Sequence, residues 1–310
     1  MAQYILRKFF FMVLTILLII TFTFFLMHAV PGSPFDQDEK GSSEAVRQNL
    51  MAHYHLDQPL VMQYLLYLKS LVQFDLGPSI ASSSETVNDM INRAFPVSFT
   101  LGIVALLFAI FSGVALGTVA ALRHNRIIDH AAMVFAVLGI AVPNFVIASL
   151  LIKYVAVQWQ LLPAATWGTW KHVILPSLAL ATGPLAIIAR FTRANMLEVL
   201  NQEYIDTARA KGLSPASVVL KHALRNAILP VITLLGPLLA NVLTGSFVIE
   251  KIFAIPGMGK YFIDSVGNRD YAVIMGTTVF YSVLLIFFMF LVDVAYSIID
   301  PRIKFHSKEV

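Results

Sequence analysis

Long apolar segments separated by polar stretches make up most of the chain. Several of them approach the roughly 20 apolar residues that a helix needs to cross a bilayer. Charged residues gather in the breaks between them. The pattern therefore predicts an all-α, polytopic membrane protein with six transmembrane helices. These are expected at about residues 9–30, 97–122, 131–157, 172–191, 227–249 and 272–299.

The first long polar stretch, residues 31–96, lies between the first two expected spans and is rich in acids. Within it, the segment from Pro59 to Phe74 carries apolar residues spaced for one face of an amphipathic helix. A docking platform for a binding protein and a plain folded loop are both open interpretations. The residues that form the expected apolar face are Leu60, Tyr64, Leu65, Leu68 and Leu71.

The second polar stretch, residues 194–226, lies between the fourth and fifth expected spans and predicts a helix, a turn and a second helix. Tyr204, Ile205 and Ala208 favour a short first helix. Gly212 follows the last basic residues, where a left-handed helix stop is expected. Ser214 then fits an N-cap, and Pro215 the first residue of the second helix. A solvated loop that happens to be helical is the plainer alternative.

The distribution of basic residues predicts the orientation in the membrane. Thirteen lysines and arginines fall in the segments expected inside, against eight in the longer segments expected outside. Because basic residues favour the cytoplasmic side, both termini are expected to be cytoplasmic. The 31–96 region is then extracytoplasmic, the 194–226 loop is cytoplasmic, and residues 1–310 form a single transmembrane domain. A signal peptide is the alternative for the first apolar run, but that run is longer than a usual signal core.

Composition supports a membrane protein and gives no sign of catalytic chemistry. Hydrophobic residues make up 58% of the chain and charged residues only 13%. The chain has no cysteine, which excludes disulfides and cysteine-based metal sites. The closest approach to a phosphate-binding loop, at Gly257, lacks Ser or Thr after Lys260. We therefore predict no catalytic residue, no metal site, no cofactor bound by this chain and no nucleic-acid partner.

The cytoplasmic loop resembles that of permease subunits of ATP-binding-cassette (ABC) importers. Their signature is Glu-Ala-Ala, three residues and Gly, which Asp206, Thr207, Ala208 and Gly212 match in part. Asp stands for Glu here, and Thr stands for the first Ala. The following Leu-Pro lies further from the glycine than in the general signature, as in the peptide-permease branch. Further stretches resembling this branch, closest to its oligopeptide B-type subunit, are PGSPF, FDLGPS, FPVSFTLG, VIEKIFAIPGMG, NRDY and IIDPRI.

The resemblance implies a permease subunit of an ATP-driven oligopeptide importer in the prokaryotic cell membrane, forming half of the translocation pathway. The implied partners are a homologous second permease subunit, two ABC ATPase subunits, an extracytoplasmic peptide-binding protein and membrane lipid. ATP and Mg are expected on the ATPase subunits. The residues implied to couple this chain to an ATPase are Glu203, Tyr204, Asp206, Thr207, Ala208, Arg209, Gly212 and Leu213.

Polar and helix-breaking residues at membrane depth suggest which spans face the pathway. Such residues are tolerated where they face protein or water, so the third and fifth expected spans are the candidates. Helix packing is an equally good explanation for the same residues. The candidate pathway residues are Pro143, Asn144, Thr233, Asn241, Thr244 and Ser246.

Other functions stay open at this point. Within the same family, the cargo could be dipeptides, nickel or another small solute. An autonomous secondary carrier would be favoured by a charge pair at the membrane midplane or by inverted repeats, and neither is evident. An intramembrane enzyme would need paired catalytic groups on facing spans, and none stands out.

Overall fold

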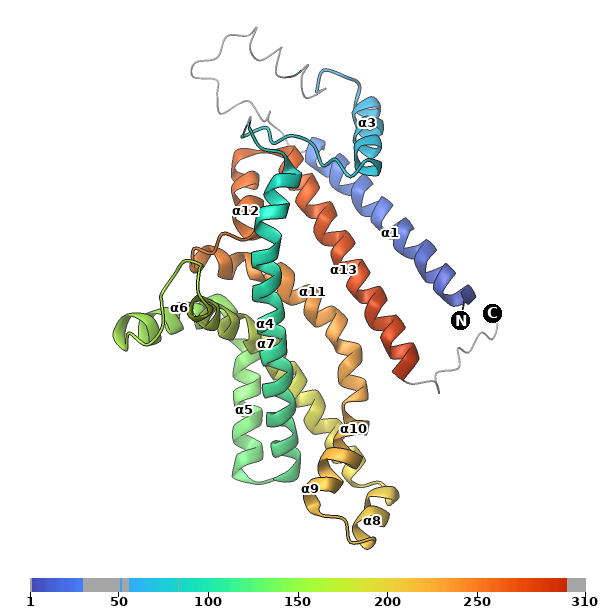
Figure 1. Cartoon of the computed structure of the whole chain (residues 1–310), viewed down its shortest axis with the longest axis vertical. Coiled ribbons are helices and arrows are strands. Elements are labelled where there is room, and N and C mark those ends of the chain that lie inside the picture. Colours follow the sequence, from blue (N-terminus) through green and yellow to red (C-terminus); the bar gives the residue numbers. More distant parts are fainter. Residues whose placement is uncertain (1, 30–50, 52–55, 83, 300–310) are drawn as a thin grey trace. The chain divides into compact units, whose positions relative to one another are not determined.

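The computed structural model describes residues 2–29, 51, 56–82 and 84–299. The chain divides into two compact units, Met1–Val97 with Pro256–Ile286 and Ser98–Ile255 with Phe287–Val310. Helices α4 (Val87–Leu122) and α13 (Tyr271–Ile299) each contribute to both units (Figure 1). In the described ranges, extended backbone pairs only at one isolated bridge between Pro78 and Thr86.

Five described helices are long and apolar enough to cross a membrane, which confirms the all-α, polytopic prediction. They are α1 (Ala2–Ala29), α4, α7 (Trp170–Leu200), α11 (Leu229–Ile252) and α13. A sixth candidate is a broken span, in which α5 (Ile127–Ala141) and the helix Asn144–Gln158 meet at 104°. The second part of this span comprises α6 (Asn144–Leu151) and the π-helical segment η1 (Ile152–Gln158).

The break in this span has a local cause at Pro143. Proline disfavours helical backbone at the residue before it, and Val142 is extended with φ −86° and ψ 120°. Pro143 itself has ψ 137°, and α6 starts at the next residue. The third expected span is therefore two helices joined by a sharp bend, and the sequence pattern shows only the site of the interruption.

Two spans are longer than their apolar runs predict. Helix α4 begins at Val87, because Thr86 and Asp89 cap it reciprocally: the Thr86 hydroxyl accepts from the Asp89 N–H, and the Asp89 carboxylate accepts from the Thr86 N–H. Pro96 lies inside the helix without ending it. Helix α7 continues to Leu200, so the first residues of the expected 194–226 loop extend this helix.

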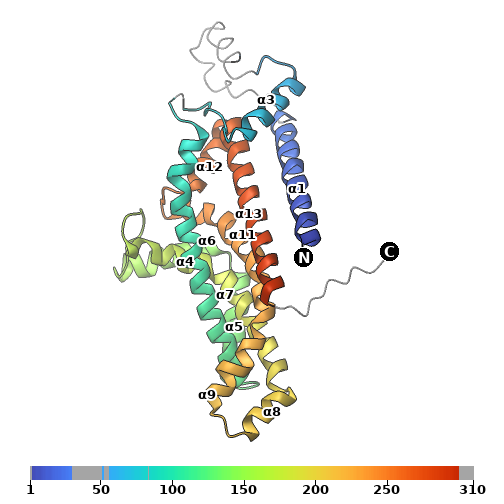
Figure 2. The same ribbon diagram turned by 45° about the vertical axis from the view of Figure 1, so that its right-hand side comes forward.

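The first unit has an aromatic core where α1 meets α3 (Leu60–Val72) and α13. Phe24, Tyr271 and Met275 are buried there, with Tyr64 and Tyr67 of α3 packed against them. The Tyr64 hydroxyl lies 2.6 Å from that of Thr21 on α1. The predicted amphipathic helix is thus present, and Figure 2 shows α3 beside one end of α1.

The second unit is built on close contacts among α4, α5 and α7. A Cβ on Gly117 of α4 would lie 2.4 Å from the Ala189 carbonyl oxygen of α7, and a Cβ on Gly139 of α5 would lie 3.0 Å from that of Thr182. The approach at Gly117 requires glycine, and the one at Gly139 is tighter than an ordinary Cβ contact. After α7 the chain forms α8 (Glu203–Ala210), α9 (Pro215–Ser217), η2 (Val218–Ala223) and α10 (Leu224–Ala227), which lead into α11 (Figure 1).

Candidate functional site: the α8 end of the second unit

Helix α8 is a short, sharply terminated helix. The Gly212 N–H donates to the Arg209 carbonyl (2.9 Å), and the Leu213 N–H donates to the Ala208 carbonyl (3.4 Å). This pair of hydrogen bonds is a Schellman motif, which requires a left-handed residue after the helix. Gly212 has φ +75°, so the predicted left-handed stop is confirmed. A Cβ here would meet no atom within 4 Å, so the requirement for glycine is one of backbone conformation alone.

The second helix starts where the sequence predicts. The Ser214 side chain accepts from the Ser217 N–H at 3.3 Å, and Pro215 occupies the first turn. From Val218 the helix continues as the π-helical segment η2 and then as α10. The turn and the caps together fix the direction in which the chain re-enters the apolar sequence of α11.

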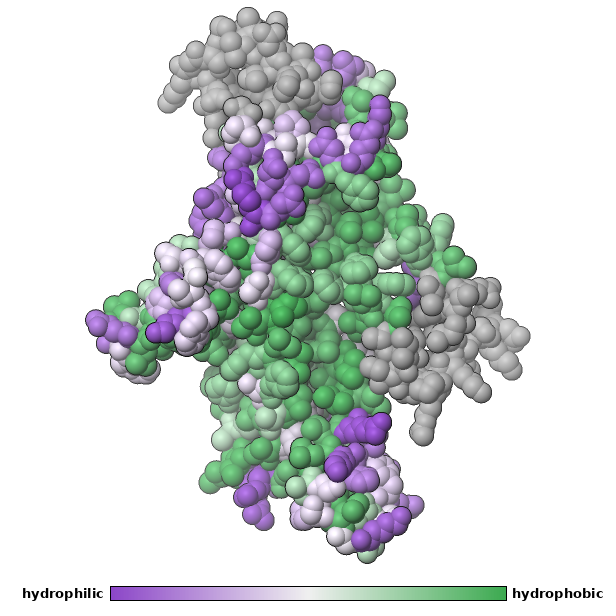
Figure 3. All heavy atoms as spheres, in the orientation of Figure 1, coloured by the Kyte–Doolittle hydropathy of each residue, from purple (hydrophilic) through white to green (hydrophobic). Residues whose placement is uncertain are grey.

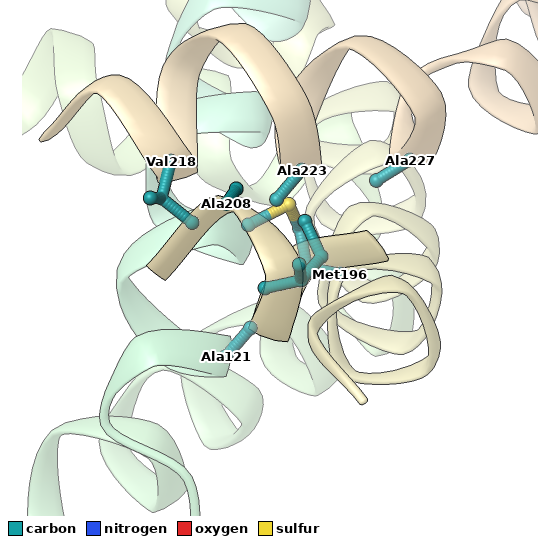
Figure 4. Close-up of a cluster of buried hydrophobic side chains, with 7 residues drawn as sticks. Ala121, Met196, Ala208, Val218, Ala223 and Ala227 are labelled. Atoms are coloured by element: carbon teal, nitrogen blue, oxygen red, sulfur yellow. The ribbon is translucent and has the colours of Figure 1, made fainter. Parts of the chain in front are cut away.

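The α8 end has its own apolar core, which we call the α8 cluster. It joins residues of α8 to the end of α4, to α7 and to the second helix (Figure 4). Ala208, one of the residues implied to couple this chain to an ATPase, is only 5% exposed and packs inside this cluster. Its small side chain therefore lets α8 pack closely against other helices of the same chain. The members of the α8 cluster are Ala121, Met196, Ile205, Ala208, Val218, Ala223 and Ala227.

The opposite face of α8 is exposed and polar, as Figure 3 shows by the hydrophilic residues at this end. Arg209 and Asp206 form an exposed ion pair with a 3.0 Å contact. The Tyr204 hydroxyl accepts from the Asn226 side-chain amide of α10 at 2.9 Å. The surface is thus held in shape from behind and is suited to docking. The exposed residues among those expected to couple are Glu203, Tyr204, Asp206, Thr207, Arg209, Gly212 and Leu213.

A buried carboxylate close to this cluster has no counterpart in the sequence predictions. Asp129 in the first turn of α5 is 1% exposed. The Arg193 guanidinium of α7 donates to both of its oxygens, at 2.5 Å and 2.8 Å. The Asn125 N–H donates to the same carboxylate at 2.9 Å, and the His124 Nδ1 lies 3.4 Å from it. The acid beside a short basic inner segment is the signal that could have drawn attention to Asp129, but it does not point to Arg193 as the partner.

The candidate pathway residues fall on two helices that contact each other, α6 and α11. Pro143 is exposed at the bend, and Asn144 is half-buried at the start of α6. On α11, Asn241 is exposed and Thr233 half-buried. Ser246 is fully buried and donates to the Leu243 carbonyl, so it faces the interior of its unit. The side chain of Thr244 lies outside the described residues.

The described residues include no group of three or more histidine, cysteine, aspartate or glutamate side chains that could hold a metal ion. The α8 end offers caps, an apolar core and exposed polar side chains. These features can bind another protein and transmit its movement. They do not provide a nucleophile beside a base or a cradle for phosphate.

The fold defines a polytopic helical membrane protein, and comparison with known families identifies its type. Residues 113–305 match the family described as the binding-protein-dependent transport system inner membrane component. Residues 1–102 match the N-terminal membrane component of such systems. The chain belongs to this family of transport permeases. It is accordingly a multi-pass protein of the prokaryotic cell membrane, as the sequence predicts.

Relatives narrow the family to peptide importers. The chain is 61% identical over 308 residues to the dipeptide transport system permease protein DppB of Bacillus subtilis, covering 99% of this chain and 100% of that protein. It is 46% identical to the oligopeptide transport system permease protein OppB of Haemophilus influenzae, covering 94% and 95%. The predicted membership of the peptide branch of ABC importer permeases is therefore confirmed.

Solved structures share the fold at low sequence identity. An inward-facing structure of the MetNI methionine ABC transporter matches with a TM-score of 0.57 at 16% identity, covering 68% of this chain and 96% of that chain. An amino acid ABC transporter with histidines matches with a TM-score of 0.51 at 17% identity, covering 67% and 92%.

Proposed function

We propose that this chain forms half of the translocation pathway of an ATP-driven importer of short peptides, paired with a homologous second permease subunit. The observation that carries the proposal is the α8 end: a rigid, polar surface element on a helical permease of the peptide family. A short helix that keeps its shape through its own core can seat in a groove on another protein. In this proposal Ala208 anchors α8 from inside. The contact face consists of Glu203, Tyr204, Asp206, Thr207, Arg209 and Leu213.

The proposed importer contains two ABC ATPase subunits, which hold ATP and Mg. Helix α8 of this chain binds one of them, while an extracytoplasmic binding protein delivers the peptide. The purified chain alone should hydrolyse no ATP, since its sequence lacks a phosphate-cradling loop. Proteoliposomes containing all components should import labelled peptide, and omission of any one component should abolish import. Magnesium-dependent ATP turnover by the isolated chain would contradict this division of labour.

The proposed cargo is a short peptide selected by the binding protein. The resemblance of the sequence motifs favours oligopeptides, whereas the 61% identity over nearly the full chain is to a dipeptide permease. That identity supports dipeptides as the preferred cargo of the assembled importer. Calorimetry of the binding protein with peptides of two, three and five residues, followed by uptake competition, tests the preference for dipeptides. Binding of nickel chelates in place of every peptide would redirect the proposal to another solute.

The proposed pathway runs along α6 and α11, where polar residues lie at membrane depth. The chain has no native cysteine, so single cysteines can be labelled without background. Asn144→Cys, Asn241→Cys and Thr244→Cys in the assembled complex should react with water-soluble thiol reagents. Ser246→Cys is the matched control and should stay protected, because Ser246 is buried within its own unit. Protection of the first three, with labelling of Leu235→Cys, would place the pathway elsewhere.

A further inference from the structure

The carboxylate of Asp129 holds together three segments at one end of the second unit. It accepts two hydrogen bonds from Arg193 of α7 and one from the Asn125 N–H in the turn between α4 and α5, while belonging itself to α5. Asn125 has φ +58°, so this turn takes a defined left-handed form beneath the carboxylate. A bidentate contact between a guanidinium and a carboxylate is directional as well as strong. We call Asp129 and Arg193 the clamp.

The clamp and the α8 cluster share helix α7, and each also contacts the end of α4 or the turn that follows it. Arg193 and Met196 lie about one turn apart on α7, and Met196 is completely buried in the α8 cluster. Ala121 belongs to the same cluster and lies at the end of α4, just before the turn that the clamp contacts. Figure 4 shows Met196 and Ala121 in the cluster with Ala208 of α8. Helix α8 therefore packs against the second helix, α7 and the end of α4, and the clamp attaches α5 to α7 and to the turn after α4.

From the clamp to the bend, α5 stays close to α7. Gly139 of α5 approaches the Thr182 carbonyl so closely that a Cβ would lie 3.0 Å from it. Two residues after α5 ends, Pro143 starts the 104° turn into α6, which carries Asn144. The 15 residues of α5 span about 22 Å at 1.5 Å per residue. Helix α5 is thus one continuous helix from the clamp to the bend.

We propose that Asp129 and Arg193 are positioning residues that transmit displacement of α8 to α5, and through α5 to the bend at Pro143. The proposal rests on the proposed function, in which an ATPase moves α8. With the clamp closed, α5 follows α7 as one body, since well-packed helices shift together rather than deform. With the clamp broken, the first turn of α5 can shift against α7, and the displacement is lost before it reaches the bend.

A purely structural role for the pair predicts a different result. A buried ion pair is weak support for stability in general, because desolvation of both charges offsets their attraction. If the pair only holds the subunit together, breaking it lowers the amount of assembled importer and leaves each remaining complex normal. If it positions α5, each assembled complex still hydrolyses ATP but imports fewer peptides per ATP.

The test uses the complete importer in proteoliposomes, with Asp129→Asn and Arg193→Lys made separately. Arg193→Lys keeps the positive charge, but a lysine ammonium cannot make the bidentate contact with the carboxylate. Assembled complex, ATP turnover and peptide import are measured together. We expect assembly and ATP turnover to persist, and the number of peptides imported per ATP to fall on the order of fivefold or more. Glu85→Gln is the matched control, since it breaks an ion pair with Arg93 that is largely exposed.

A second measurement follows the displacement itself. In an otherwise unchanged complex, ATP should alter the rate of thiol labelling at Asn144→Cys. Adding Asp129→Asn should abolish this ATP-dependent change in labelling rate. The ATP-dependent change in labelling rate at Asn241→Cys, on α11, should remain. The double variant Asp129→Asn with Arg193→Gln should be no worse than Asp129→Asn alone, because both changes break one interaction.

Two results would contradict the proposal that the clamp transmits displacement. One is an unchanged number of peptides per ATP in both variants, and the other is failure of both variants to assemble, which would make the pair a folding element only. Absence of ATP-driven import by the parent complex would instead reject the proposed function, so the two failures can be told apart.

Discussion

Two aspartates, one in each unit, are equally buried but are held in different ways. Asp129 in the second unit is 1% exposed and takes two of its hydrogen bonds from a charged guanidinium on another helix. Asp270 in the first unit is also 1% exposed, and the donors to it from the described residues are neutral. They are the Ser79 hydroxyl at 2.6 Å and the backbone N–H groups of Ile80, Ala81 and Val273 at 3.0 to 3.1 Å.

The difference indicates what each carboxylate can do. Asp270 caps α13 through the Val273 N–H and fixes the backbone of residues 79–81, so it holds a loop in one shape. Asp129 joins two helices through flexible side chains, so it can keep α5 and α7 together while both move. The first arrangement is suited to a static support, and the second to a moving connection.

The largest effect is expected from Asp270→Ala. The change leaves four donors without their acceptor, two of them buried and two part-buried, and each unmet buried group costs about 1–3 kcal/mol. We expect a loss of ~3 kcal/mol or more in unfolding free energy, with less subunit in the membrane and a normal number of peptides per ATP in what remains. Thermal unfolding of the purified complex measures the loss. Glu85→Ala is the control, since an exposed pair contributes at most about 1 kcal/mol. An unchanged unfolding temperature in Asp270→Ala would contradict the role of Asp270 as a static support.

Asp129→Asn should destabilise the subunit less than Asp270→Ala, by about 2 kcal/mol. The amide oxygen can still accept from Arg193, whose side chain is 23% exposed and can recover water. The same unfolding experiment compares the two variants, and transport measurements complete the comparison. The contrast between the carboxylates would disappear if Asp270→Asn, and not Asp129→Asn, lowered the number of peptides per ATP.

The sequence predicts the features that depend on neighbouring residues. The apolar runs locate the five described helices that are long enough to cross a membrane, Gly212 marks the left-handed stop of α8, and Ser214 with Pro215 marks the start of the second helix. Each of these follows from local chemistry: the width of a bilayer, the φ allowed to glycine, or a hydroxyl that meets a free N–H.

The features that depend on distant residues cannot be predicted in this way. Asp129 and Arg193 are 64 positions apart, and nothing local marks either of them as the partner of the other. Ala208 has the small side chain that the resemblance requires, but only the packing of α7, α4 and η2 shows that it faces inward. The 104° bend is similar: Pro143 marks an interruption, while the direction of α6 depends on its contacts with α7 and α11.

Gly212→Val tests the α8 end without touching either carboxylate. A branched residue in the left-handed region costs about 1–2 kcal/mol, and the open space around Gly212 adds no clash. We expect the subunit to insert normally, while ATPase co-purification and peptide import both fall. Gly212→Asn should be milder, since asparagine tolerates this region. Gly267→Ala, at a helical glycine with equally open space, is the control and should leave import unchanged. Normal import by Gly212→Val would remove the α8 turn from the coupling path.

The smallest effect is expected from Tyr204→Phe, which removes the hydroxyl that accepts from Asn226. Both residues are exposed, so water can replace the bond, and the cost should be about 0.5–1 kcal/mol. Because the bond joins α8 to α10 within the α8 end, its loss should loosen the docking surface and leave the connection from α7 to α5 intact. Import should fall slightly through weaker ATPase binding, and the number of peptides per ATP should stay normal when ATPase is in excess. Asn226→Ala should have the same effect, and the double variant should be no worse than either single change. A lower number of peptides per ATP in Tyr204→Phe, at saturating ATPase, would place transmission in the hydrogen bond from α8 to α10 rather than in the Asp129 carboxylate.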